Sequence, residues 1–174
     1  MTLEIPMGDV NLDGGSYNSP LPGRYIGEVN AWGESEDKPD LYHADLEISF
    51  GSPDGQAGKT QRVFFNFGGD NPKAVGVNYA RFIRYGVAVG LCTQAEAEAA
   101  KANGTSLKLD PEASIGKKLC FDVVKAKTKS GVSIDWGMYP VDSDEAKRLV
   151  NETAPDGDVQ PPAEEEATPF DAIL

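Results

Sequence analysis

The chain has 174 residues, 40% of them hydrophobic and 25% charged, with a net charge of −12. This length and composition are typical of one globular domain with flexible ends. No basic start precedes an apolar stretch at the N-terminus, and no apolar run is long enough to cross a bilayer. We therefore expect neither a signal peptide nor a membrane span, and a cytoplasmic location.

The charge is unevenly distributed along the chain. Residues 1–58 hold eleven acids and two bases, a net charge of −9. Residues 59–140 hold seven acids and twelve bases, a net charge of +5. Residues 141–174 hold ten acids and two bases, a net charge of −8. A basic middle segment between acidic ends indicates that the middle segment meets a charged partner.

The first strand is expected in the sequence GRYIGEVNAWG, after residues 1–20, which are rich in Gly, Asn, Asp, Ser and Pro and predict an irregular arm. Alternation places Tyr25 and Val29 on one face of this strand and Ile26 and Trp32 on the other.

Two further strands follow at short intervals. YHADLEISF alternates strictly, which predicts an inward face made of Ala44, Leu46, Ile48 and Phe50. QRVFFNF predicts a third strand with Arg62 and Phe64 on its outer face. Three strands joined by short loops indicate an antiparallel meander.

The pattern then becomes helical. Asn71 is a good N-cap and Pro72 suits the first helical position, and apolar residues recur after them at helical spacing. A second helix is predicted to begin after Thr93, with Glu96 completing a capping box, and to end near Gly104.

Residues 116–141 predict two more strands around a turn at KSG. The predicted fold is therefore mainly β: a five-stranded, OB-fold-like antiparallel barrel over residues 21–140, with a helical insert between strands 3 and 4. Other small barrels and α+β sheets share this element order. Residues 141–174 are expected to form an acidic, Pro-rich tail with an apolar tip.

Motifs for metal or nucleotide chemistry are incomplete. GDVNLDGG begins like a calcium loop, but Pro20 stands where the loop needs its bidentate carboxylate. GQAGKT resembles the end of a phosphate-binding loop but precedes a strand instead of a helix. Cys92 and Cys120 lack CxxC spacing and are predicted to be reduced thiols, and His43 is expected on the polar face of its strand. We expect no cofactor, no metal and no catalytic residues, and hence no enzyme.

Basic and aromatic residues are interleaved in the middle segment, the combination that grips single-stranded nucleic acid: cations follow the phosphates and flat rings stack on bases. The candidate DNA-binding residues are Lys59, Arg62, Phe64, Lys73, Arg81, Arg84, Lys125, Lys127, Lys129, Trp136 and Tyr139.

The aromatic candidates differ in how well alternation supports them. Trp136 shares its parity with Ile134 and Met138, which favours a core position over a stacking platform by roughly two to one. Phe64 and Tyr139 have the opposite parity to the core and are the stronger stacking candidates.

The C-terminal segment ends PPAEEEATPFDAIL. Acids tethered near a basic groove compete with phosphate, and an apolar tip can enter a pocket on another protein. The candidate partner-binding residues are Glu164, Glu165, Glu166, Pro169, Phe170, Ile173 and Leu174.

An OB-like body followed by a Pro-rich linker and an acidic tail with a Pro-Phe motif resembles the bacterial and phage single-stranded DNA-binding proteins. LPGRYIGEV, YHADLEISF, VFFNF with its following helix, and GKKLCFDVV also resemble a family of small phage proteins of the replication and recombination region, often described only as a domain of unknown function. Here DAIL follows Phe170, whereas the bacterial tails end on the phenylalanine.

The resemblance implies sequence-tolerant binding of single-stranded DNA in phage or bacterial replication, recombination or repair, in the host cytoplasm if a phage encodes the chain. It also implies recruitment of replication or recombination proteins through the tail. The alternative is a protein-binding adaptor with an OB-like barrel and no nucleic-acid binding. A third hypothesis, a nuclease, needs clustered metal-binding acids, and its candidates are scattered across different strands: Asp45, Glu47, Asp122 and Asp135. A choice between DNA and RNA, and whether the chain forms a homo-oligomer, stay open.

Overall fold

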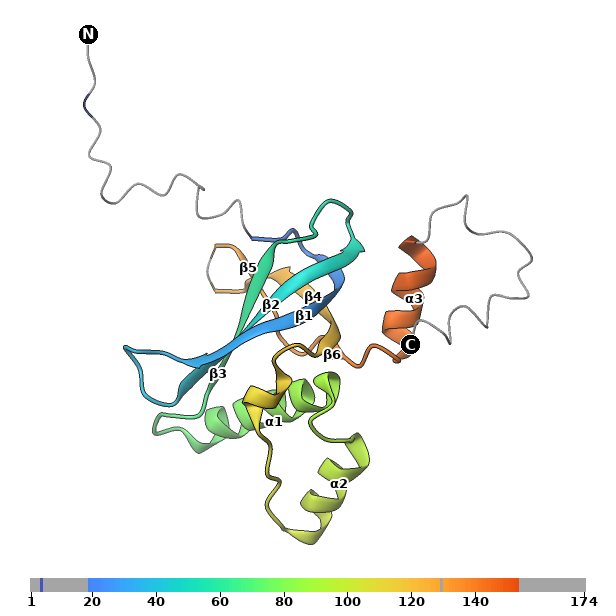
Figure 1. Cartoon of the computed structure of the whole chain (residues 1–174). Coiled ribbons are helices and arrows are strands. Elements are labelled where there is room, and N and C mark those ends of the chain that lie inside the picture. The colour runs from blue at the N-terminus through green and yellow to red at the C-terminus, as the bar shows by residue number, and fades with distance from the viewer. Residues whose placement is uncertain (1–3, 5–18, 129, 154–174) are drawn as a thin grey trace, which may run out of the picture.

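The structure, a computed structural model, describes Glu4 and residues 19–128 and 130–153 (Figure 1). Its centre is one sheet of six antiparallel strands, in the order β3-β2-β1-β4-β5, with β6 also paired to β4. The strands are β1 (Gly23–Glu34), β2 (Leu41–Ser52), β3 (Thr60–Asn66), β4 (Lys118–Lys125), β5 (Val132–Ser133) and β6 (Met138–Tyr139). The expectation of a mainly antiparallel β-fold is confirmed, and among the described strands no backbone ladder joins β3 to β5, so the sheet is open.

Two α-helices lie between β3 and β4, as the capping signals predict: α1 (Pro72–Val89) and α2 (Gln94–Asn103). A short 3-10 helix, η2 (Pro111–Ser114), follows them. The Asn71 side chain accepts hydrogen bonds from the backbone N–H groups of Lys73 and Ala74, and Pro72 occupies the first turn. Thr93 and Glu96 form both halves of the capping box. In Figure 1, α1 lies against one end of the sheet and α2 lies beyond α1, farther from the strands.

The main core fills the space between the curved sheet and α1. Its largest fully buried side chains include Tyr25, Leu46, Phe65 and Phe121 from the strands and Tyr85 from α1. The Tyr85 hydroxyl donates to Ser114 Oγ at 2.7 Å, so this buried polar group has a partner. Burial raises the Tyr85 pKa to about 12.

Two irregularities in the β1–β2 ladder change which side chains face the core. Val29 pairs with Leu46 and Ala31 with Asp45, so the extra residue in β1 brings Trp32 to the same side as Val29. Trp32 packs against the main core and stacks on Phe65 and Tyr85. It is thus a core residue, contrary to the face that alternation assigns to it.

A second irregularity moves Phe50 out of the core. Ile26 pairs with Phe50 and the next residue, Gly27, pairs with Ile48. Ile48 and Phe50 therefore point to opposite faces, and Phe50 is 39% exposed. The expectation that Phe50 points inward with Ile48 is wrong, because the extra residue in β2 reverses the alternation.

The returning strand of the last hairpin is also interrupted. β5 ends at Ser133 and β6 begins at Met138, and in between the Met138 N–H donates to the Trp136 carbonyl at 2.9 Å. Ile134 and Met138 are buried as expected, but Trp136 is 44% exposed. The parity argument that favoured a core position for Trp136 is therefore wrong, since it assumed a continuous strand.

A third helix, α3 (Asp144–Thr153), lies in the segment that the sequence assigns to the tail. Ala146 and Leu149 are buried against Ile26 and Cys120, on the face of the sheet away from the main core. Hence the folded part of the chain continues past residue 140 and includes this helix.

Both cysteines are free, as expected, but they are buried instead of half-buried. Burial raises the pKa of the Cys120 thiol to about 12. Within the described residues, no helix combines the length and the apolar character that crossing a membrane requires.

Candidate nucleic-acid interface

A groove of about 420 Å³ lies between β3 and the segment that links β4 to β6. We call it the β3–β5 groove. Its lining residues are Gln61, Arg62, Val63, Phe64, Arg81, Ala126, Lys127, Thr128, Ser130, Val132, Ser133, Ile134 and Asp135. The groove thus brings together four of the predicted DNA-binding residues from three separate parts of the chain.

Arg81 shapes this groove by joining its two walls. Its guanidinium donates to the Phe64 carbonyl on β3 at 3.1 Å, and to the carbonyls of Ile134 and Asp135 at 2.8 and 3.2 Å. The guanidinium also lies over the Phe65 ring, 5.7 Å from its centroid. Burial lowers the pKa of Arg81, and nearby Asp135 opposes that shift.

The Arg81 side chain therefore acts chiefly as a cross-link between β3 and the residues after β5. A second contact spans the same gap, where Gln61 Nε2 donates to the Val132 carbonyl at 3.5 Å. Together these side chains hold the two ends of the open sheet beside each other.

Arg62 lines the groove but has an intramolecular partner. It stands directly opposite Asp45 in the β2–β3 register, and its Nε and Nη2 donate to the two carboxylate oxygens at 2.6 and 2.9 Å. The hydrogen bond from Arg62 lowers the Asp45 pKa, and the same bond raises the Arg62 pKa. Because the Arg62 side chain is 48% exposed, water screens this pair and its net contribution to stability is small.

Phe64 supplies an exposed aromatic face next to these charges. It is 47% exposed, and its ring centroid lies 6.2 Å from that of His43, its partner in the β2–β3 register. Burial, followed by the charge of Arg62, lowers the His43 pKa, so the imidazole is neutral at neutral pH. The Phe64 ring is hydrophobic and exposed to water, so it is available for stacking on a base.

The lysines contribute to the groove to different extents. Lys127 lines it and is exposed, and Lys125 is exposed at the end of β4. Lys59 donates to Gln56 Oε1 at 3.0 Å, and Lys73 is exposed in the first turn of α1. Lys129 lies outside the described residues.

Two other predicted DNA-binding residues, Arg84 and Tyr139, belong to a separate cluster. The guanidinium carbons of Arg24 and Arg84 lie 5.1 and 5.3 Å from the centroid of the Tyr139 ring. The Tyr139 hydroxyl donates to Asp122 at 3.2 Å, and Asp122 also binds Arg24 through hydrogen bonds of 2.6 and 3.0 Å. Burial and Asp122 raise the Tyr139 pKa, and the Asp122 hydrogen bond raises that of Arg24.

In this cluster Tyr139 is half-buried and its hydroxyl has a carboxylate partner, so it offers less open ring than Phe64 does. Trp136, although exposed, does not line the β3–β5 groove.

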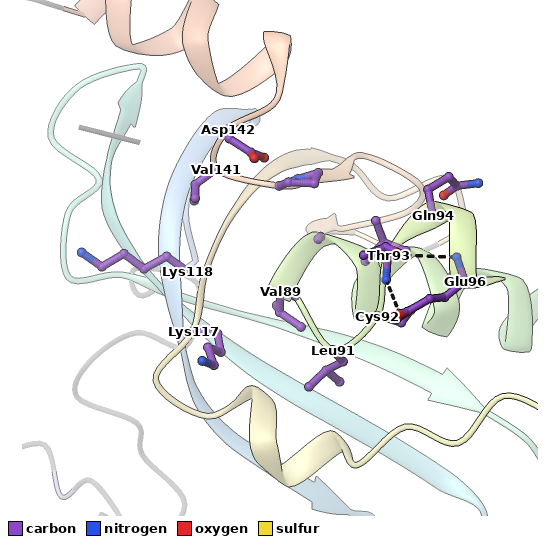
Figure 2. A pocket seen from close by; sticks show the side chains of 14 residues that line it. Val89, Leu91, Cys92, Thr93, Gln94, Glu96, Lys117, Lys118, Val141 and Asp142 are labelled. Carbon is purple, nitrogen blue, oxygen red and sulfur yellow. Dashed lines mark hydrogen bonds between the residues drawn. The ribbon is translucent and has the colours of Figure 1, made fainter. Parts of the chain in front are cut away.

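A larger cavity of about 790 Å³ lies at the corner between α1 and α2. Figure 2 shows its walls: Leu91 to Gln94 from the corner, Lys117 and Lys118 at the start of β4, and Val141 and Asp142 before α3. Thr93 and Glu96 satisfy each other there through the capping box, at 2.8 and 3.1 Å. The Thr93 and Glu96 side chains are thus engaged in capping the N-terminus of α2.

Acidic residues in the described part of the chain do not gather into a metal site: no group of three or more His, Cys, Asp or Glu side chains there could hold an ion. Asp45 and Asp122, two of the acids that would be considered for a nuclease, are each bound to an arginine.

Two residues that decide how the groove is built, Asp45 and Gln61, are not among the DNA-binding candidates predicted from the sequence. Asp45 neutralises Arg62, and Gln61 joins the walls. For the Asp45–Arg62 contact the sequence carries one signal: both residues are expected on the outer faces of their strands. The β2–β3 register then places the two side chains opposite each other. The predicted partner-binding residues Glu164, Glu165, Glu166, Pro169, Phe170, Ile173 and Leu174 lie outside the described residues.

Comparison with protein-family models and with curated proteins found no match to this chain.

Proposed function

We propose that this protein binds single-stranded nucleic acid, in the first instance DNA, with little sequence selectivity, and that the β3–β5 groove is its contact surface. The observation that carries the proposal is the placement of the exposed Phe64 ring beside Arg62 and Lys127, which come from two separate segments. A stacked base contributes about 1–3 kcal/mol, and cations beside it attract the phosphates on either side.

The strand order supports the same proposal. The path β3-β2-β1-β4-β5, with α1 inserted between β3 and β4, has the element order of an OB-fold. The Gln61 and Arg81 contacts bring β3 and β5 together where a barrel of this type would close. We therefore assign an OB-like barrel as part of the proposal, with the groove on the face bordered by β3 and by the β4–β5 connection.

The groove favours single strands over duplexes on physical grounds. Stacking on Phe64 requires a base whose face is not covered by its neighbours, which a base inside a duplex does not offer. The proposal includes a role in replication or recombination, with the acidic C-terminal segment recruiting partner proteins through Glu164, Glu165, Glu166, Pro169, Phe170, Ile173 and Leu174.

The test is a fluorescence-anisotropy titration of the full chain with labelled oligo-dT and with a duplex of the same length, at several salt concentrations. We expect tighter binding to the single strand. The logarithm of the affinity should fall with the logarithm of the salt concentration with a slope of about −1.4 to −2.1, for two or three neutralised phosphates. Equal affinity for both DNAs, or no binding at low salt, contradicts the proposal.

The second candidate function is a protein-binding adaptor. It is favoured by the Arg62–Asp45 pair, which neutralises one cation of the groove, and by the exposed acids Glu36 and Asp37 in the loop between β1 and β2. This function predicts a partner that binds the folded body when oligonucleotide is absent and that is not displaced when oligo-dT is added.

A further inference from the structure

A second groove, of about 700 Å³, lies between α1 and α2 and is mostly apolar. We call it the α1–α2 groove. It is lined by Phe67, Tyr79, Ala80, Phe82, Ile83, Gln94, Ala97, Glu98, Ala100, Lys101, Thr105, Leu107 and Leu109. Its volume is within the usual range for ligand pockets, about 300–1,000 Å³.

The floor of the α1–α2 groove is aromatic and open. Phe67 and Tyr79 stack with their ring centroids 4.7 Å apart and a 10° angle between the ring planes. Phe82 meets Phe67 edge-on at 5.6 Å. Tyr79 is nevertheless 50% exposed, so this aromatic surface is not covered by the described fold.

The second wall of the groove is α2, which contributes no buried side chain to the core. None of the residues of α2 is buried, and its ends are held by local signals, the Thr93–Glu96 capping box and the left-handed C-cap at Gly104. The small side chains of Ala97 and Ala100 face the groove and are half-buried. The described residues therefore leave the groove open, and its apolar walls suit an apolar ligand.

We propose that residues 169–174 of the same chain, PFDAIL, bind in the α1–α2 groove. Phe170, Ile173 and Leu174 stand at positions i, i+3 and i+4, a spacing that puts three side chains on one face of a single helical turn. An apolar helical face entering an apolar groove is a common mode of peptide recognition. An aromatic ring at position 170 also suits a floor of Phe67, Tyr79 and Phe82.

The chain length permits this contact. α3 ends at Thr153, and Phe170 follows 17 residues later, which allows a reach of up to roughly 56–61 Å. A folded body of this size is only about 35–40 Å across, judged from its expected radius of gyration of about 14 Å. A tether of this kind holds its end at an effective concentration on the order of mM.

Charge also favours the acidic segment over a neutral one. Lys101 lines the groove, and the exposed Lys108 lies between two of its lining residues, Leu107 and Leu109. Glu98 is also in the lining, so the rim carries both signs. The three consecutive glutamates at 164–166 precede the apolar tip and can meet these lysines.

Binding in this groove makes the tip of the tail a ligand of its own chain, with which any partner protein must compete. It also places the tail acids near Lys101 and Lys108. The inference does not depend on nucleic-acid binding.

The test uses the full chain with the photo-reactive residue p-benzoylphenylalanine in place of Phe170, irradiated without nucleic acid and analysed by peptide mass mapping. We expect an adduct within one chain, on Phe67 or on the groove-lining residues between Tyr79 and Leu109, Arg81 not being one of them. We also expect its yield to fall at least about fivefold with Ala97→Glu, which fills the groove with a charge, and to stay unchanged with the matched Ala99→Glu on the exposed side of α2. Ala100→Glu serves as a second groove variant if Ala97→Glu does not fold.

Three outcomes would overturn the inference. The first is an adduct on residues of the β3–β5 groove, the second is a covalent dimer, which would mean that a second copy supplies the tail, and the third is an adduct yield insensitive to both groove variants. A failure of this experiment leaves the oligo-dT titration unaffected, so the two proposals fail separately.

Discussion

Arg62 and Asp45 face each other across β3 and β2, joined by two hydrogen bonds of 2.6 and 2.9 Å. Arg62 lines the β3–β5 groove, so a phosphate that binds Arg62 there competes with the Asp45 carboxylate. The charge balance of the groove is thus set by a strand register, and it is less positive than a count of its bases suggests.

The first prediction follows from this competition. In Asp45→Asn, Arg62 loses its partner and becomes available to a phosphate, so we expect affinity for oligo-dT to rise about two- to fivefold at low salt and the salt dependence to steepen. Folding stability should change by at most about 1 kcal/mol, because the pair is partly exposed. The control Glu47→Gln removes the same charge from the neighbouring outward position of β2. Weaker binding by Asp45→Asn would show that Asp45 is not a competitor.

Phe64 and Phe50 form a matched pair of exposed phenylalanines, 47% and 39% exposed, of which only Phe64 lines the groove. Phe64→Ala should lose about 1–3 kcal/mol of binding to oligo-dT, equivalent to roughly 5- to 150-fold in the dissociation constant. Phe50→Ala should change it less than about twofold. If the two substitutions weaken binding equally in the same titration, Phe64 does not stack on a base.

We expect Arg81 to contribute more to folding stability, through its hydrogen bonds, than to nucleic-acid binding through its charge. Arg81→Met leaves the carbonyls of Phe64, Ile134 and Asp135 without their donor and should lower the free energy of unfolding by about 2–4 kcal/mol. Arg84→Met removes the same charge from the same helix but only a contact with Tyr139, and should cost less than about 1 kcal/mol. Urea denaturation of both variants decides the matter: similar stabilities would mean that Arg81 does not join the walls.

The depressed pKa of His43 predicts a pH effect. Its pKa in the folded state is below that in the unfolded chain, so the unfolded chain takes up the proton first as the pH falls. The stabilisation is present above the unfolded value of about 6.5 and is lost as the pH drops through the folded pKa. Between pH 7.5 and 5.5 the wild type should therefore lose more stability than His43→Gln, measured as denaturation midpoints. Parallel curves would contradict the assignment.

The last substitution concerns α3. Leu149→Ala opens a cavity in the second hydrophobic cluster and should lower the free energy of unfolding by about 2–4 kcal/mol. Glu152→Ala, on the exposed side of the same helix, should stay within about 0.5 kcal/mol of the wild type. If Leu149→Ala is equally neutral, α3 does not belong to the cooperative fold.

The sequence predicted those elements whose signals are local. Asn71 with Pro72, and Thr93 with Glu96, marked the starts of α1 and α2, because caps act within one turn. Strict alternation located the strands but could not show the extra residues that move Trp32 into the core and Phe50 out of it.

Helix α3 was missed for a different reason. Ala146, Leu149 and Val150 have helical spacing, but they stand among charges in an acidic segment, where composition favoured an unfolded tail. Likewise the role of Arg81 depends on the approach of β3 to residues 134–135, a contact between parts of the chain far apart in sequence. Long-range register and closure of this kind follow from the packed structure and leave no local pattern.

The most direct test of the central claim is to locate bound nucleic acid on the protein. The full chain is irradiated with an oligo-dT carrying one 5-iodo-deoxyuridine, and the attached peptides are mapped by mass spectrometry. Binding in the β3–β5 groove predicts adducts on the peptide that contains Phe64, and loss of those adducts in Phe64→Ala but not in Phe50→Ala. Adducts confined to α2 or α3, or an unchanged map in Phe64→Ala, would contradict it.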